Sequence, residues 1–220
     1  FISLARLEES SQNFVQAGLY LQKAVEANQD FNHNDQATYS FILNNQGVLL
    51  RNMKKYNQAL LKLQEALAIR EHLFGTQSRQ YAQTCNGIGN VYHFIGKDNL
   101  ALDYFMKVLA IERTEYGSNH PEVASTLVNL ANSYSALDQY NLGIGALKEA
   151  EDILTSYPDS PILVSVYLNS AISHTELLGF EKAKFYAGKH QELVQKLYGD
   201  VSLDMANNWN IQGMILHEES

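Results

Sequence analysis

The first residues to test for catalysis or metal binding in this sequence are its seven histidines and its one cysteine. The histidines are spread along the chain, and none stands in the His-Glu-x-x-His spacing that places two ligands on one helix face. We therefore expect no metal site, no cofactor site and no catalytic centre. Cys85 lies four residues before Gly89 in a helical pattern, which predicts a buried, inert thiol.

Asparagine offers a second kind of chemistry, because it recurs at matched positions along the chain. A side-chain amide both donates and accepts hydrogen bonds, which suits the backbone of an extended peptide whatever its sequence. Arg51 adds a cation that would anchor an acidic residue. The candidate partner-binding residues are Asn44, Arg51, Asn86, Asn90, His93, Asn132 and Asn210. The alternative is that these amides only solvate the surface or tie neighbouring repeats together.

The elements that position these side chains follow from a repeat of small residues. Alanine or glycine recurs at steps of 42, 42, 42, 40 and 42 residues, at Ala5, Gly47, Gly89, Ala131, Ala171 and Gly213. A second small-residue series is interleaved with the first, at Ala17, Ala59, Ala101, Gly143 and Ala183. Apolar residues spaced three and four apart surround both series, which predicts two helices per repeat that cross closely at the small residues.

Proline and glycine predict where these helices begin and end. Pro121 and Pro161 are expected to open the first helix of their repeats, with Ser160 as an N-cap. Gly96 and Gly179 are expected to take positive φ in the turn between the two helices of a repeat. The second helix is expected to end at Gly75, Gly117, Tyr157-Pro158 and Gly199.

These patterns predict an all-α fold, a right-handed α-solenoid of tandem antiparallel helix pairs. We expect a single solenoid over residues 1–220, with repeats at about 1–35, 36–77, 78–119, 120–159 and 160–199 and a partial repeat at 200–220. Both ends of the sequence are expected to cut through a repeat. The first helices should line the concave side of the solenoid. Residues three before, one after and four after each small position should face that groove.

The repeat resembles the tetratricopeptide repeat. An aromatic residue follows the small position by three, at Tyr92 and Tyr134, and alanine recurs in the second helix, at Ala24, Ala66 and Ala150. The segments 66–75 and 120–131 are similar to the kinesin-light-chain type, whose unit is longer than the usual one. The resemblance implies a scaffold that binds partners in its groove. The first helices lack the lysine that the family's paired Lys–Asn carboxylate clamp requires.

Composition narrows the class of partner. The net charge of −8 argues against nucleic acid, because phosphate binding needs clustered lysine and arginine. No apolar stretch approaches the roughly 18–20 residues that span a bilayer, so membrane insertion is not expected. One cysteine fits a reducing compartment, and we expect a cytoplasmic protein, with a cytoskeletal or ciliary location by analogy with related scaffolds.

The sequence leaves more than one function open. The preferred hypothesis is a non-enzymatic adaptor that binds a segment of a partner protein in the groove. The alternative is a structural subunit that is packed permanently within a larger assembly, and it predicts exposed apolar residues on the convex surface. A sensor that closes on its own flanking chain is a further alternative. No arrangement of nucleophile and base supports an enzyme.

Overall fold

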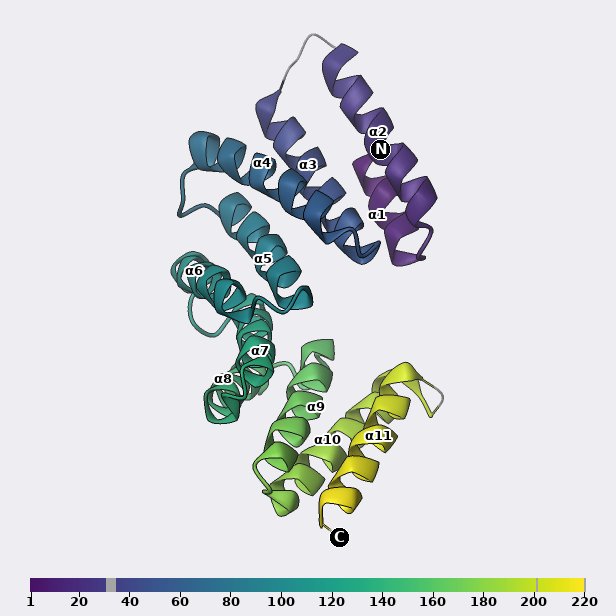
Figure 1. Cartoon of the computed structure of the whole chain (residues 1–220), viewed down its shortest axis with the longest axis vertical. Coiled ribbons are helices and arrows are strands. Elements are labelled where there is room, and N and C mark those ends of the chain that lie inside the picture. Colours follow the sequence, from purple (N-terminus) through teal and green to yellow (C-terminus); the bar gives the residue numbers. More distant parts are fainter. Residues whose placement is uncertain (31–34, 201, 220) are drawn as a thin grey trace. The chain divides into compact units, whose positions relative to one another are not determined.

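The computed structural model describes residues 1–30, 35–200 and 202–219, which form α-helices joined by turns and loops (Figure 1). The first helix of each repeat, called an A helix below, is α1 (Ile2–Ser10), α3 (Gln36–Asn52), α5 (Arg79–Phe94), α7 (Pro121–Ala136), α9 (Pro161–Glu176) or α11 (Leu203–Glu219). The second, called a B helix, is α2 (Phe14–Asp30), α4 (Tyr56–Phe74), α6 (Asp98–Tyr116), α8 (Tyr140–Leu154) or α10 (Phe180–Tyr198). The predicted all-α fold of tandem helix pairs is confirmed.

The chain divides into two compact halves, which are described separately. The N-terminal half covers Phe1–Ile111 and the C-terminal half covers Glu112–Ser220, so the division falls within α6. In the N-terminal half α1 contacts α3 and α3 contacts α5, while α2 and α4 pack against the A helices on either side. In the C-terminal half α7, α9 and α11 form the corresponding series, with α8 and α10 packed against them. Each half therefore presents its own row of A helices.

Small residues stand where A and B helices cross, as the sequence predicts. A Cβ atom added to Gly47 would lie 2.5 Å from Leu63 Cγ, and one added to Gly89 would lie 2.7 Å from Phe105 Cε1. Both distances are shorter than any real contact allows, so a larger side chain would push the two helices apart. The small positions thus let a large B-helix side chain reach the A-helix backbone.

Aromatic residues fill the space beside these crossings. Tyr92 of α5 stacks on Tyr104 of α6, with ring centroids 5.7 Å apart. His174 of α9 stacks in the same way on Tyr186 of α10, also at 5.7 Å. Cys85 is fully buried against Val108 and Ile111 of α6. The predicted burial of this cysteine is confirmed, and burial raises the pKa of its thiol to about 11.

The turn between the A and B helices has a left-handed residue at a fixed position. Gly96 has φ of +71°, as predicted, but Gly179 has φ of −89° and serves as the N-cap of α10, so its prediction is wrong. The left-handed residue there is Leu178, with φ of +56°. The corresponding residues of the other turns are Gln12, Lys54 and Asp138, with φ between +58° and +61°. The turn geometry is thus retained without glycine in four of five cases.

The B helices end as predicted at Gly75, Gly117 and Gly199, where φ is +79°, +84° and +78°. The fourth end differs from the prediction, because α8 stops at Leu154 and Pro158 lies in the loop beyond it. Thr155 Oγ1 donates to the carbonyl oxygen of Glu151, and a hydroxyl at this position competes with the helical hydrogen bonds. The step of 40 residues in the repeat therefore reflects a shorter α8 followed by a longer loop.

The predicted starts of α7 and α9 are confirmed. Both helices begin at proline, and Ser160 Oγ accepts a hydrogen bond from the backbone N–H of Ile162 at 3.3 Å. His120 caps α7 in a similar way, because its Nδ1 accepts from the N–H of Glu122 at 3.2 Å. These caps fix where the A helices start and hence which side chains lie on their exposed faces.

Candidate functional site

The A helices of the N-terminal half are tied together by their amides. Asn44 on α3 is half-buried, and its Oδ1 accepts a hydrogen bond from the Thr84 hydroxyl on α5 at 3.1 Å. On the other side of α3, Asn45 Oδ1 accepts from Arg6 Nε on α1 at 2.8 Å. One amide of this pair thus links α3 to α5 and the other links it to α1.

Arg51 belongs to a polar cluster at the C-terminal end of α3. Its Nε and Nη2 donate to Asn52 Oδ1 at 3.1 and 2.9 Å, and Asn52 Nδ2 in turn donates to Glu9 on α1. Burial lowers the pKa of Arg51, and the charge of Glu9 opposes this effect. Burial also raises the pKa of Glu9, although Arg51 and Asn52 act against it. Arg51 is therefore a partly desolvated cation on a fixed support.

Asn86 and Asn90 are the candidate residues that the structure brings into direct contact. Asn90 Nδ2 donates to the backbone oxygen of Asn86 at 2.9 Å and lies 3.3 Å from its Oδ1. Both side chains are half-buried on α5. This internal bond holds the Asn90 side chain against the helix.

His93 lies in the last turn of α5 and is half-buried. Its Nδ1 lies 2.6 Å from Oδ1 of Asp98, which begins α6 and is 5% exposed. The pair therefore closes the turn between α5 and α6 and gives His93 a structural partner that the sequence analysis did not identify.

The two candidates of the C-terminal half lie on different helices. Asn132 on α7 is half-buried, and its Oδ1 accepts from Asn169 Nδ2 on α9 at 2.7 Å. Asn210 lies on the exposed face of α11. Asn132 thus links successive A helices in the same manner as Asn44, through a partner 37 residues away in the sequence.

Two charged residues at the seams between B and A helices, Arg70, which is buried, and Glu112, which is half-buried, were not predicted. Arg70 on α4 donates from Nη1 to the Thr84 hydroxyl on α5 at 2.8 Å. Glu112 accepts from the Thr126 hydroxyl on α7 at 2.7 Å. Arg70 and Glu112 are 42 residues apart, and each precedes its threonine by 14 residues. The 42-residue repeat was the sequence signal that could have shown that Arg70 and Glu112 occupy equivalent positions.

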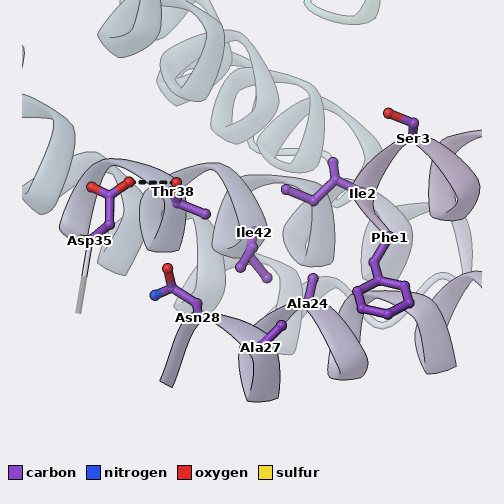
Figure 2. Close-up of a pocket in the computed structure, with 9 residues that line it drawn as sticks. All are labelled: Phe1, Ile2, Ser3, Ala24, Ala27, Asn28, Asp35, Thr38 and Ile42. Atoms are coloured by element: carbon purple, nitrogen blue, oxygen red, sulfur yellow. Dashed lines mark hydrogen bonds between the residues drawn. The ribbon is translucent and has the colours of Figure 1, made fainter. Parts of the chain in front are cut away.

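A pocket of about 520 Å³ lies beside the first residues of the chain (Figure 2). Figure 2 shows Phe1 of the chain start with Asn28 of α2 and Thr38 of α3 among the residues that line it. Two of its polar residues have structural partners, because Asp35 Oδ2 accepts from the Thr38 hydroxyl at 2.6 Å and Asp35 Oδ1 accepts from the N–H of Ala37. Since these groups cap α3, we assign no binding site to this pocket.

The described residues, 1–30, 35–200 and 202–219, show neither a metal-binding cluster nor a membrane-spanning helix. Those residues contain no group of three or more His, Cys, Asp and Glu side chains arranged to hold a metal ion. None of the helices described there combines the length and apolar character needed to cross a bilayer.

The family follows from the sequence of the central repeats. A model of the tetratricopeptide repeat matches residues 38–114 and 86–156, which together cover more than half of the chain. The protein belongs to the tetratricopeptide repeat family. Repeats of this family are generally scaffolds for protein–protein interaction. No curated protein matches the sequence.

Several solved structures share the fold. BtubC (BKLC) from P. vanneervenii is 19% identical with a TM-score of 0.78, covering 91% of this chain and 81% of that one. The TPR-like repeats of a kinesin-light-chain candidate from Podosopora anserina are 15% identical with a TM-score of 0.73, covering 90% and 94%. PilW, a type IV pilus biogenesis factor, is 18% identical with a TM-score of 0.72, covering 99% and 86%. The predicted similarity to kinesin-light-chain repeats is thus confirmed for the fold.

Proposed function

We propose that this protein is a non-enzymatic adaptor that binds an extended segment of a partner protein on the exposed face of its A helices. The family supports an interaction scaffold, and the arrangement of the amides supports this particular surface. The proposed contact residues are those predicted from the sequence, with Asn44, Arg51 and Asn90 at the centre of the N-terminal half.

The observation that carries the proposal is that the amide side chains are each held in place through one hydrogen-bonding group and keep the other for a partner. Asn44 Oδ1 accepts a hydrogen bond from Thr84, and Asn90 Nδ2 donates one to the backbone of α5. Among the described residues, Asn44 Nδ2 and Asn90 Oδ1 have no hydrogen-bond partner, and both side chains are half-exposed. A pre-oriented donor and a pre-oriented acceptor on neighbouring helices match the alternating N–H and C=O groups of an extended peptide.

Arg51 extends this surface toward an acidic group. Two of its three nitrogens are held by Asn52, and Nη1 has no partner among the described residues. Its charge is already partly desolvated, so a carboxylate of the partner would gain a charge-assisted hydrogen bond at a smaller further desolvation cost. The proposed ligand is therefore an extended segment with an acidic side chain near Arg51.

The test is affinity capture from the source cells with Asn44→Ala/Asn90→Ala. Loss of two hydrogen bonds at about 1 kcal/mol each predicts roughly a tenfold or greater drop in captured partner. The matched control is Asn57→Ala/Asn99→Ala, which removes two exposed asparagines from the B helices α4 and α6. Equal capture by both double variants and the wild type would refute the proposed surface.

A structural subunit of a larger assembly is the second candidate. It is favoured by large apolar side chains that are exposed on the B helices, such as Leu61 at 66% and Phe185 at 59%. Leu61→Ser together with Phe185→Ser should leave the adaptor's partner bound but release an assembly that covers the B helices. A cytoplasmic location, beside a cytoskeletal or ciliary assembly, is part of the same proposal and rests on the single, buried free thiol of Cys85.

A further inference from the structure

A second surface lies on the B-helix side of the N-terminal half. An apolar groove of about 560 Å³ runs between α2 and α3, with Lys62 of α4 at its edge. Leu21 and Leu49 contribute buried surface to it, and Val15 and Leu19 stand on α2 with 73% and 48% of their surface exposed. Since Val15 and Leu19 are four residues apart, they lie on one side of α2.

The groove exists because of Gly18. In the next three repeats the corresponding residues are Leu60, Leu102 and Ile144, at steps of 42. Leu60 packs against the buried cluster that includes Ala59, Ile88 and Val91. A Cβ atom added to Gly18 would meet only Leu49 Cδ2, at an ordinary 3.8 Å. The space above Gly18 therefore fits a branched aliphatic side chain, of the kind that the later repeats supply themselves.

The charge at the edge of the groove further defines the occupant. Among the described residues that line the groove, Lys62 carries the charge. Its ammonium group is 3.5 Å from Glu65, and both side chains are about 40% exposed, so this pair contributes little and is readily exchanged. A carboxylate of a partner would therefore pair with Lys62 beside the apolar space above Gly18.

We propose that this groove binds an amphipathic helix of a partner protein, which inserts one leucine-type side chain above Gly18 and places an acidic residue at Lys62. The exposed Val15 and Leu19 provide the apolar contact on which such a helix would lie. None of Asn44, Arg51 and Asn90 lines this groove, although the first two also lie on α3. The groove therefore adds a second binding site to the proposed adaptor and does not depend on the first.

The first experiment uses a synthetic alanine-based helix that carries one leucine and a glutamate four residues later. Its binding is followed by methyl NMR of Met53 and Leu49, which line the groove, and by fluorescence anisotropy. Wild type should show shifts at these methyl groups. Replacing the peptide's leucine with alanine should weaken binding at least tenfold. No methyl shift at millimolar peptide, or equal binding of the leucine-free peptide, would overturn the proposal.

The second experiment fills the groove from within. Gly18→Leu should weaken peptide binding at least tenfold and raise the melting temperature, because it fills the space above Gly18 and removes a helix-interior glycine. The control is Gly145→Leu, at an exposed position of α8 with open space around it, which should leave binding unchanged. Undiminished binding by Gly18→Leu would overturn the proposal.

A charge exchange tests the acidic contact independently of the packing. Lys62→Glu is an exposed substitution on α4 that should weaken the glutamate peptide several-fold. A peptide with lysine in place of that glutamate should bind Lys62→Glu better than it binds wild type. If neither charge change alters binding, the pairing of Lys62 with an acidic residue is wrong.

Discussion

Arg70 and Glu112 occupy the same position in successive repeats, yet they carry opposite charges. Each stands near the C-terminal end of a B helix, and each bonds the hydroxyl of a threonine 14 residues later in the following A helix. Thr84 accepts a hydrogen bond from Arg70, whereas Thr126 donates one to Glu112. A hydroxyl serves both because it is at once donor and acceptor. The position thus requires a polar partner for threonine, and either sign of charge satisfies it.

The two residues differ in how they are supported. Arg70 is fully buried, donates to Thr84 and to the backbone oxygen of Gln80, and lies over the Phe41 ring at 4.6 Å. Burial lowers its pKa to about 10, so it remains charged at neutral pH. Burial raises the pKa of Glu112 to about 7, with only Thr126 acting against it. One seam is therefore insensitive to pH near neutrality and the other is not.

The largest effect is expected from Arg70→Ala. The change removes the bonds to Thr84 and Gln80 and the contact with Phe41, and leaves a cavity, so we expect a loss of about 3–4 kcal/mol in the free energy of unfolding. Urea denaturation measures it. Arg113→Ala, which breaks an exposed ion pair with Glu149, should cost under about 1 kcal/mol. Equal effects of the two changes would show that burial does not distinguish these arginines.

The next effect concerns the pH dependence of Glu112. Its pKa is about 7 in the folded chain against a model value of 4.5, so folding favours the protonated form. Its stabilising contribution is full below pH 4.5 and is lost as the pH rises through about 7. Glu112→Gln should therefore gain about 2 kcal/mol over wild type between pH 5 and pH 8. A stability difference that stays constant over this range would contradict the account.

A smaller effect separates the two threonines. Thr84→Val should cost about 1–2 kcal/mol at every pH from 5 to 8, because a permanently charged Arg70 loses an acceptor. Thr126→Val should cost about 1 kcal/mol at pH 8 and less at pH 5, where the carboxyl group of Glu112 is protonated. Thermal unfolding at the two pH values compares them. Identical pH profiles would remove the distinction between the seams.

The smallest effect compares the turns of the two halves. Leu178 takes positive φ and is 66% exposed, so Leu178→Gly should stabilise by about 0.5–1 kcal/mol through relief of backbone strain. Gly96→Ala, at φ of +71° with open space around it, should destabilise by a similar amount. Differential scanning calorimetry of both variants checks the signs. Two changes of the same sign would contradict the proposed strain.

The sequence predicted the parts of this fold that depend on local rules. Gly47 and Gly89 marked the helix crossings because only a small residue fits there, and Pro161 marked a helix start because it lacks an N–H group. The predictions for Gly179 and Pro158 are wrong because other residues set the structure there. Leu178 takes the left-handed conformation in place of Gly179, and α8 ends at Leu154, before Pro158. A glycine or proline therefore predicts a helix boundary only where no neighbouring residue adopts the required conformation first.

The candidate site was predictable only as a row of positions. The helical period indicated that Asn44 and Asn132 lie on A-helix faces, but not that Thr84 and Asn169 would bond them, because those contacts depend on how helices 37 to 40 residues apart pack together. The roles of Arg70 and Glu112 were not predicted for a similar reason. Nothing in the local sequence distinguishes a buried charged residue from a solvated one on the same helix.

Site-specific crosslinking tests the proposed binding surface most directly. A benzoylphenylalanine at Val48, on the A-helix face one residue after Gly47, is compared with one at Met106, which is 47% exposed on the B helix α6. The adaptor account predicts that Val48 crosslinks one continuous segment of a partner protein and that Met106 does not. Crosslinks from Met106 alone, or none from Val48 when a partner is bound, would contradict it.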